Sequence, residues 1–349
     1  MRQGSPVSAA TRPVEPPAGL VESPIAPSAG PAAGQELPVL QQRWVSLPLR
    51  VGEITLKHLR FDLQVANEPL AAALAHRVLQ AKTLAAARGA AEGLQLKGAW
   101  TDAAGPGLVV QDGWIRYLYS VYPRYYLDLR AGYAAYLGKF SSKSQYNLRR
   151  QRRVYFEKQG VAPALVCART PEEVEDFYRR ARKVSELTYQ EKLLGSGLPA
   201  GADFVARMHE AARAGQVRGY LLPGADGRDA AYMYCLVAGD DLVCKYIGYD
   251  PEVATLSPGS TLLLMAIEQL CNEGELRYFD FEEGGAQYKK QFATGSEPCG
   301  NLLLLPNRPA HRLKLVAHAG LAAAMRRAGA LADRLGVRAA IRRMVRRAA

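Results

Sequence analysis

The sequence predicts an α/β fold in which helices flank a mixed β-sheet. Residues 241–294 follow the order strand, loop, helix, strand and short helix. The Val, Ile and Tyr residues of 242–249 are typical of a strand, and the apolar helix that follows suits packing on a sheet. Upstream, residues 217–222 and 230–237 read as strands joined by a turn at Asp226-Gly227. These segments predict antiparallel strands that lead into a strand–helix–strand unit.

Four regions follow one another along the 349 residues. Residues 1–38 are rich in Pro, Ala, Gly and Ser without periodicity, which predicts a disordered tail. Residues 39–131 contain strand-like runs, the last of them interrupted by Pro123, and predict a smaller N-terminal α/β lobe. We expect a second domain at residues 132–308 and a basic, loosely amphipathic helical segment at residues 309–349.

Three helices of the second domain have recognisable start or stop signals. Ser141 or Ser142 can cap a helix at residues 144–159, which Gly160 follows. Thr170-Pro171-Glu172-Glu173 has the pattern of a capping box with Pro at the first helical position, and predicts a helix that runs to about residue 194. A third helix starts at Ser257-Pro258, with the serine as cap, and stops at Gly274.

Composition bounds the kind of protein and its partners. The formal charge of +12 favours anionic partners such as nucleotides, nucleic acid or anionic lipid. Five scattered cysteines without a C-x-x-C pair predict buried reduced thiols, and hence a cytoplasmic protein. The five histidines form no metal-binding motif, so we expect no metal. The sequence contains no stretch of about 20 apolar residues, so we expect no membrane span.

The loop before the third helix has the features of an anion site. The first N–H groups of a helix have no internal partners, and the helix dipole places partial positive charge there. Gly259 would let a ligand approach the backbone. The pyrophosphate of a nucleotide cofactor is a suitable occupant. Without a G-x-G-x-x-G or P-loop motif, an ordinary capped helix remains the alternative.

Residues 144–159 form a second candidate for phosphate contact. Arg149 and Arg153 align one helical turn apart, and Arg150 lies beside them. The guanidinium fork suits phosphate, so these arginines are candidates for binding a nucleotide or an anionic acceptor. The alternative is a basic helix that faces only water.

Two ordered motifs carry a family resemblance. LSPGSTLLLMAIEQLCNEGELRYFDFEEGGAQYKKQFAT at residues 256–294 and SSKSQYNLRRQRRVYFEKQG at residues 141–160 resemble the signatures of CelD/BcsL-type acetyltransferases of the GNAT superfamily. The resemblance implies a GNAT-like sheet, in a two-lobed tandem arrangement as in the more distant FemAB-type ligases. It implies acetyl-CoA as co-substrate and a sugar, polysaccharide precursor or small amine as acceptor, in exopolysaccharide or envelope biosynthesis.

The resemblance also implies roles for individual residues. Asp280 and Glu282 are candidate bases at the end of a strand, and Tyr288 is a candidate proton donor. Pantetheine would lie along the strand at Tyr246, Ile247 and Gly248. The pyrophosphate would lie at Ser257, Pro258, Gly259, Ser260 and Thr261. Besides the three arginines, the expected substrate contacts are Glu186, Tyr189 and Lys289.

Two further functions stay open at this point. A FemAB-like ligase would use aminoacyl-tRNA as its donor. A non-catalytic protein would use the basic C-terminal segment for association with a membrane or polymer. In that segment Leu331, Leu335, Ala339, Ile341 and Val345 fall on one side of a helix, which favours peripheral contact with an anionic membrane at its inner face. The alternative is a helix that packs on the domain.

Overall fold

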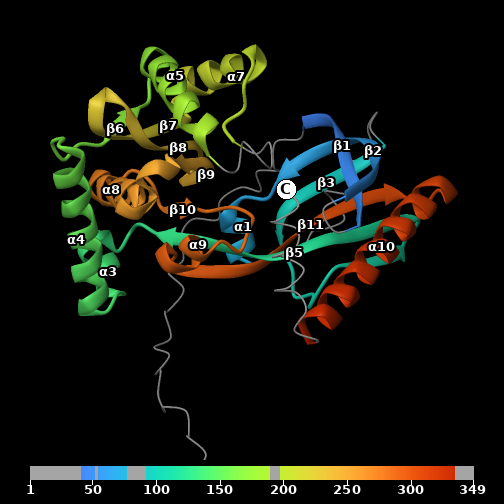
Figure 1. The fold of residues 1–349 in the computed structure, drawn as a ribbon. Coiled ribbons are helices and arrows are strands. Elements are labelled where there is room, and N and C mark those ends of the chain that lie inside the picture. The colour runs from blue at the N-terminus through green and yellow to red at the C-terminus, as the bar shows by residue number, and fades with distance from the viewer. Residues whose placement is uncertain (1–40, 52–53, 77–91, 189–196, 335–349) are drawn as a thin grey trace, which may run out of the picture. The chain divides into compact units, whose positions relative to one another are not determined.

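The computed structural model describes residues 41–51, 54–76, 92–188 and 197–334. The predicted tail at residues 1–38, the candidate Tyr189 and the end of the C-terminal segment lie outside these residues. Eleven strands of the described chain form one mixed sheet in the order β1-β2-β3-β11-β5-β10-β9-β8-β7-β6, with β4 paired to β5 (Figure 1). The predicted α/β fold with helices flanking a mixed sheet is confirmed.

The first half of the sheet combines strands from both ends of the sequence. β1 (Gln41–Val51) and β2 (Ile54–Asn67) are antiparallel, and β3 (Gly93–Trp100) runs parallel to β2. β11 (Gly295–Pro306) lies between β3 and β5 (Trp114–Asp128), and β4 (Gly107–Gln111) pairs with the start of β5. The short helix α1 (Leu70–Leu74) contacts β3, and α10 (Pro309–Arg334) packs on β1, β4 and β5.

The second half continues from the C-terminal part of β5. This part pairs with β10 (Tyr278–Asp280), which runs parallel to β9 (Asp241–Tyr249). The strands β8 (Asp229–Ala238), β7 (Val217–Pro223) and β6 (Val166–Ala168) follow in antiparallel order. The boundary expected at residue 132 falls just after β5, and the sheet continues across it.

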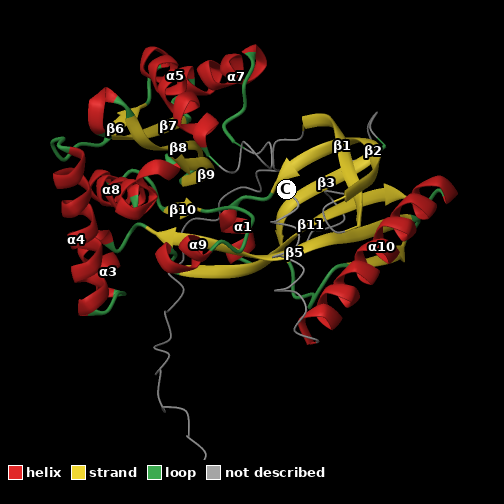
Figure 2. Cartoon of the chain, in the orientation of Figure 1, coloured by secondary structure: helices red, strands yellow, loops and turns green. Residues whose placement is uncertain are grey.

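Helices cover both faces of this second half (Figure 2). On one side, α8 (Pro258–Glu273) packs on β7, β8 and β9 and against α3 (Gly132–Gly138) and α4 (Ser142–Gln159). On the other, α5 (Pro171–Leu187) packs on the same strands and against α7 (Ala202–Arg213). The 3₁₀ turns η1 (Ala225–Gly227) and η2 (Pro251–Leu256) and the helix α9 (Gln287–Phe292) complete the chain. None of the described helices is both long enough and apolar enough to cross a bilayer.

Most of the helix caps and helix ends that the sequence predicts are present in the structure. The Ser141 side chain accepts a hydrogen bond from the Ser144 N–H and caps α4. Thr170 and Glu173 form the capping box of α5, with Pro171 at its first turn. Gly274 ends α8 in the left-handed conformation that glycine adopts without strain. These elements are fixed by neighbours in sequence, and the sequence therefore predicts them well.

Three expectations were wrong. Pro123 does not interrupt β5, because it lies opposite Pro298 of β11, so that the two residues without an N–H face each other. The helix expected to reach residue 194 ends at Leu187, since Thr188 turns to an extended conformation and donates its hydroxyl to the Ser185 carbonyl. Ser257 precedes α8 but makes no side-chain capping bond.

Candidate functional site

A cavity of about 580 Å³ lies where the two halves of the sheet meet. Its wall includes residues from β1, β2 and β3, from β5, from α7, and from the neighbouring strands β8 and β9. Glu282 and Glu283, which follow β10, also line it. Cavities of this volume suit small-molecule ligands. The cavity therefore marks the candidate site, and it combines segments that are far apart in the sequence.

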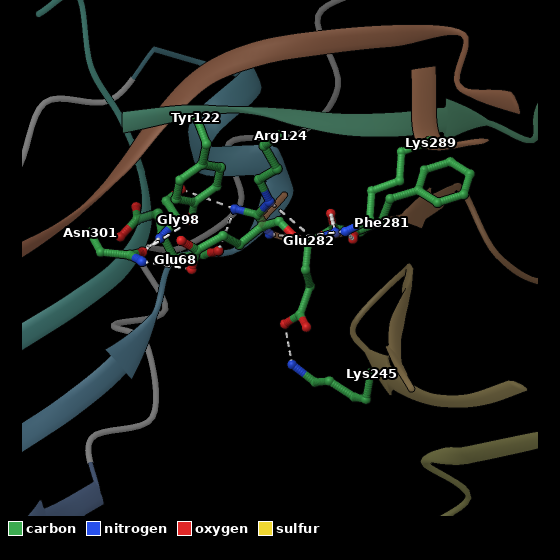
Figure 3. A network of polar contacts seen from close by, with 11 residues as sticks. Glu68, Gly98, Tyr122, Arg124, Lys245, Phe281, Glu282, Lys289 and Asn301 are labelled. Carbon is green, nitrogen blue, oxygen red and sulfur yellow. Dashed lines mark hydrogen bonds and ion pairs between the residues drawn. The ribbon is translucent and has the colours of Figure 1, made fainter. Parts of the chain in front are cut away.

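Arg124, which lines the cavity, forms a buried ion pair with Asp280 in the polar network of Figure 3. Arg124 of β5 donates from Nε and Nη2 to Oδ2 of Asp280, at 3.1 and 2.6 Å. The same guanidinium donates from Nη1 to the carbonyls of Glu68 and Gly98, at 2.9 and 3.1 Å. The Asp280 side chain is fully buried, and its Oδ1 accepts the N–H of Glu282 at 2.8 Å. Arg124 thus ties β3, β5, β10 and the residue that follows β2 together.

Glu282 differs from Asp280 in reaching the cavity. Its side chain is one-third exposed and forms an ion pair with Lys245 of β9. Its backbone has a φ of 53°, in the left-handed region that non-glycine residues rarely adopt. Such conformations occur where the surrounding structure imposes them, often at functional sites. Of the two predicted carboxylates, Glu282 is the one whose oxygens face the ligand space.

Lys289 holds the turn that carries Glu282. Its ammonium group is buried and donates to the carbonyls of Phe281 and Glu283, both at 2.6 Å. Burial lowers the pKa of Lys289, while nearby thiol and carboxylate groups oppose this shift. Glu283 in turn accepts a hydrogen bond from Asn301 of β11 at 2.8 Å. Lys289, expected as an anion contact, is directed at backbone oxygens of its own turn.

Aromatic residues form one side of the cavity. The rings of Tyr234 and Tyr246 are stacked at 6.3 Å between centroids, with an interplanar angle of 29°. Phe204 of α7 contacts both rings edge-on. Basic residues reach the same cavity from β1, β3 and α7, namely Arg43, Lys97 and Arg207. The lining thus offers flat apolar surfaces, carboxylates and cations to a ligand.

β9 has an irregularity beside the cavity. In its pairing with β8, Cys235 lies opposite Cys244 and Tyr234 lies opposite Tyr246, so Lys245 is an extra, bulged residue. The pairing of β9 with β10 ends at Val243. Lys245 is therefore paired with no residue of β8 and with no residue of β10. Bulges of this kind free backbone groups next to ligand sites.

Tyr288 lies on the other face of the sheet, in the core that α8 covers. It packs against the cluster that includes Cys244, and its ring contacts Phe281 edge-on at 6.2 Å. Burial raises the pKa of Tyr288 well above its usual value, and the thiols of Cys244 and Cys235 add to this shift. The phenol therefore keeps its proton at neutral pH.

The start of α8 has hydrogen-bonding groups without partners among the described residues, which is a feature of anion sites at helix starts. Ser257 has a left-handed backbone and makes no side-chain cap. The Thr261 side chain is buried, and its Oγ1 has no hydrogen-bond partner in the described chain. Pro258 is buried and Ser260 is half-buried. At Gly259 a Cβ would lie 3.2 Å from the Tyr249 ring, so this glycine makes room for that ring.

The remaining strand residues of the predicted donor site point to different faces. The Tyr246 side chain lies on the α5 and α7 side, whereas Ile247 packs into the core below α8. At Gly248, a Cβ would lie 2.6 Å from the Tyr232 ring and 3.0 Å from Cγ2 of Thr188. Gly248 therefore allows α5 to approach β9 closely.

The predicted substrate contacts on helices do not line the cavity. Arg149, Arg150 and Arg153 are exposed on α4, which packs beside η2 and α8. Arg153 pairs with Glu157 of its own helix at 3.5 Å. Glu186 is exposed on α5 and pairs with Arg182 at 3.1 Å. The arginines thus lie on the exposed side of a helix that packs beside η2 and α8, and they do not line the cavity.

Sequence reasoning missed several residues of the site. Arg124 is the one basic residue within the aromatic stretch at residues 117–127, and Lys245 interrupts the apolar strand VCKYI. A single charged residue in an otherwise apolar strand needs a partner of opposite charge. The sequence could therefore have indicated that Arg124 and Lys245 form ion pairs. Asn301 and Tyr122 had no such signal, because only the pairing of β11 with β5 brings them together. No group of three or more potential metal ligands occurs among the described residues.

Comparison with known proteins agrees with this geometry in part. Residues 142–290 match the family model of the acetyltransferase (GNAT) domain. No curated protein matches the chain. Among solved structures, FemX has 11% identity and a TM-score of 0.48, over 79% of this chain and 90% of its own. L-PGS from Bacillus licheniformis has 14% identity and a TM-score of 0.41, over 74% and 84%.

A tandem GNAT protein from the clavulanic acid biosynthesis pathway is also similar, with 17% identity and a TM-score of 0.34, over 74% of this chain and 82% of its own. These values are too low to bear on activity or substrate. The assignment to the CelD/BcsL type stays a prediction. The family model spans α4 to α9, which includes the bulge of β9, the start of α8 and the turn after β10. This part of the chain is therefore similar in sequence to GNAT-type acetyltransferase domains.

Proposed function

We propose that the protein is an acyl-CoA-dependent acyltransferase, with acetyl-CoA as donor and a polar acceptor bound in the cavity. One observation carries the proposal. β9 runs from the cavity, which Lys245 lines, to Tyr249, whose ring lies beside Gly259 at the start of α8, and Lys245 is paired with neither β8 nor β10. A donor along β9 would therefore have an anion site at one end and an acceptor space at the other.

The groups at the start of α8 fit the phosphates of such a donor. The first N–H groups of the helix are without intrahelical partners, and Ser257 does not cap them. The Thr261 hydroxyl is a buried donor without a partner in the described chain. These groups, with the helix dipole, would bind an anion. Acyl-CoA supplies the acyl group in activated form, as a thioester.

The residues around β9 have distinct tasks in this proposal. Glu282 accepts the proton of the acceptor amine or hydroxyl, and Lys245 holds its carboxylate in place. The unpaired backbone at Lys245 polarises the acyl carbonyl as negative charge develops on its oxygen. Tyr288 lies on the opposite face of the sheet, in the core that α8 covers, so the leaving thiolate takes its proton from the protonated Glu282 or from water. Asp280 and Lys289 keep the Glu282 turn in place.

The lining of the cavity supports an acceptor of polar, flat-faced chemistry. Half-buried aromatic rings such as those of Phe204 and Tyr246 can pack against the faces of sugar rings, while carboxylates accept hydrogen bonds from hydroxyl or amino groups. We therefore propose a sugar, a polysaccharide precursor or a small amine as acceptor, in envelope or exopolysaccharide biosynthesis.

The proposal is tested by thermal unfolding with acetyl-CoA and free CoA. A ligand at a hundred times its Kd should stabilise the protein by about 2.7 kcal/mol. Thr261→Val should weaken this effect, and it should leave the free protein as stable or more stable, because the buried hydroxyl has no partner to lose. Gly259→Glu, which places a negative charge at the helix start, should abolish binding.

Thr255→Val on the exposed part of η2 is the matched control, and it should bind CoA as the unaltered protein does. Equal CoA binding by Thr261→Val would remove the assigned phosphate site. A folded protein that ignores every CoA but binds tRNA, with a steep loss of affinity on adding salt, would replace this proposal with the ligase alternative.

A further inference from the structure

Within the part of the chain that the structure describes, no other element covers the outward face of α10, and this face carries both apolar and basic side chains. The inner face is fixed to the sheet. Leu315 is fully buried in the core formed by β1, β2, β5 and β11, and His318 shares a 2.7 Å hydrogen bond with Tyr117. Lys314 lies over the Phe61 ring at 5.0 Å. These contacts fix which residues of the helix face outward.

Six residues at spacings of three and four form one continuous stripe on the outer side of α10. Every member is exposed. Three are large and apolar, with exposed fractions of 74%, 51% and 57% for Leu313, Val316 and Leu331. The outer stripe consists of Leu313, Val316, Gly320, Ala324, Arg327 and Leu331. Leu313 and Val316 are neighbours on this face and Leu331 lies further along it. Apolar side chains grouped on one exposed face are a feature of interaction surfaces.

Positive charge accompanies this stripe. Arg327 lies within it, and Arg312 and Arg334 are exposed beside it. Residues 311–349 contain ten Lys or Arg and one acid, Asp333, so nine of the twelve net positive charges of the chain lie in this segment. Among the described residues, Arg312, Arg327 and Arg334 thus place positive charge on or beside the helix face that also exposes leucine and valine.

We infer that the outer stripe of α10 is a docking surface for an anionic membrane. A helix with an apolar stripe and arginines beside it lies in the plane of the membrane interface, where the apolar side chains enter the acyl boundary and the cations meet lipid phosphates. Arginine stems can bury their methylene groups while the charge stays at the headgroups. The inference does not depend on the proposed acyltransferase activity.

Two other partners fit the surface less well. A second copy of the chain, paired through the same stripe, would bring Arg312, Arg327 and Arg334 against one another without opposite charges. A nucleic acid would meet the cations, but it would leave Leu313, Val316 and Leu331 without apolar contact. An anionic bilayer satisfies both the charge and the apolar stripe.

Sedimentation of the full chain with lipid vesicles tests this inference. The chain should bind vesicles that contain phosphatidylglycerol and should bind pure phosphatidylcholine vesicles much more weakly. Replacing Leu313, Val316 and Leu331 together by Ser should weaken binding on the order of tenfold or more. Arg312→Glu with Arg327→Glu should weaken it by at least roughly fivefold for each arginine.

The matched control reverses the same number of charges on another exposed basic helix. Arg149→Glu with Arg150→Glu on α4 should leave vesicle binding within about twofold of the unaltered chain. Circular dichroism and thermal unfolding check that each variant folds; because the altered side chains are exposed, their midpoints should not change. A variant that fails this check is replaced by Leu313→Gln alone.

Three results would overturn the inference. The first is equal binding to neutral and anionic vesicles. The second is full binding by both α10 variants, or an equal loss in the α4 control. The third is an assignment to another partner: dimers that dissociate in the Ser variant, or nucleic-acid binding that depends on Arg312 and Arg327 without any binding to vesicles.

Discussion

Glu282 is the carboxylate on which the proposed chemistry depends. Glu282→Gln keeps the shape of the side chain but removes its ability to take a proton. We expect acyl transfer to fall by about 10²–10⁴-fold, the range typical of a lost general base. Donor binding should be unchanged, because the start of α8 is a separate part of the site. Release of free CoA thiol measures turnover, and CoA-induced thermal stabilisation measures donor binding.

The Arg124 and Asp280 pair has a structural task that a mutant cycle can measure. Arg124→Met or Asp280→Asn leaves one buried group without its opposite charge, which costs about 3–5 kcal/mol. The asparagine oxygen can still accept the Glu282 N–H. Urea unfolding of both single variants and the double variant should show strong coupling, with the double variant losing much less than the sum. Additive losses would show that the pair does not act as a unit.

Asp241 gives the stability of the protein a pH dependence. It is buried at the start of β9, and burial, followed by the charge of Asp280, raises its pKa from 3.8 to about 6. The folded protein therefore retains this proton where the unfolded chain has lost it. The stabilising contribution is complete below about pH 4 and is lost as the pH rises through 6.

Asp241→Asn should remove this decline. Between pH 4 and pH 7 the unfolding free energy of the variant should fall less than that of the unaltered protein, by up to about 3 kcal/mol. Urea titrations at several pH values measure the difference. Parallel pH profiles for the two proteins would mean that Asp241 titrates normally.

At the scale of elements, the contact between α5 and β9 depends on Gly248. Gly248→Ala would place a methyl group 2.6 Å from the buried Tyr232 ring. We expect a loss of about 1–3 kcal/mol, as for other overpacked cores. Gly138→Ala at the end of α3 is the control, since nothing lies within 4 Å of its added Cβ and its stability should be unchanged or slightly higher. Equal unfolding free energies for both variants would show that α5 can move away.

The elements that the sequence predicted share one property. Ser141, Thr170 and Gly274 act on backbone groups within a few residues, so their effect can be recognised without knowing the fold. β11 was not anticipated, although its NLLLL run is apolar, because its place depends on pairing with β3 and β5. The turn after β10 was located correctly, but the burial of Asp280 and Lys289 depends on strands that are distant in sequence.

For the whole molecule, the shared sheet predicts one cooperative unfolding transition. β5 and β11 belong to the N-terminal half of the sheet, and β5 also pairs with β10, which lies in the part that matches the GNAT-type family model. All three tryptophans, Trp44, Trp100 and Trp114, lie in the N-terminal half. Their fluorescence should therefore lose its folded signal at the same urea concentration as the far-ultraviolet circular dichroism, to which the helices of the other half contribute strongly. Separate midpoints would mean that the two halves unfold independently.

The sequence could predict only those residues of the candidate site that lie close together along the chain. The start of α8, the carboxylates after β10 and Tyr288 lie within residues 257–288, and a motif could identify them. The cavity could not be predicted, because Arg124 and Asp280 are 156 residues apart and the Glu283 to Asn301 contact depends on where β11 lies. Long-range strand order leaves little trace in local composition.

The position of β11 also determines the order in which the molecule can be completed during synthesis. β3 ends at Trp100, yet the strand that joins it to β5 begins at Gly295. Until those residues leave the ribosome, β3 and β5 present open edges that can pair with the wrong partner. Contacts this distant in sequence also form slowly. The half of the sheet that is made first is thus the half whose folding is finished last.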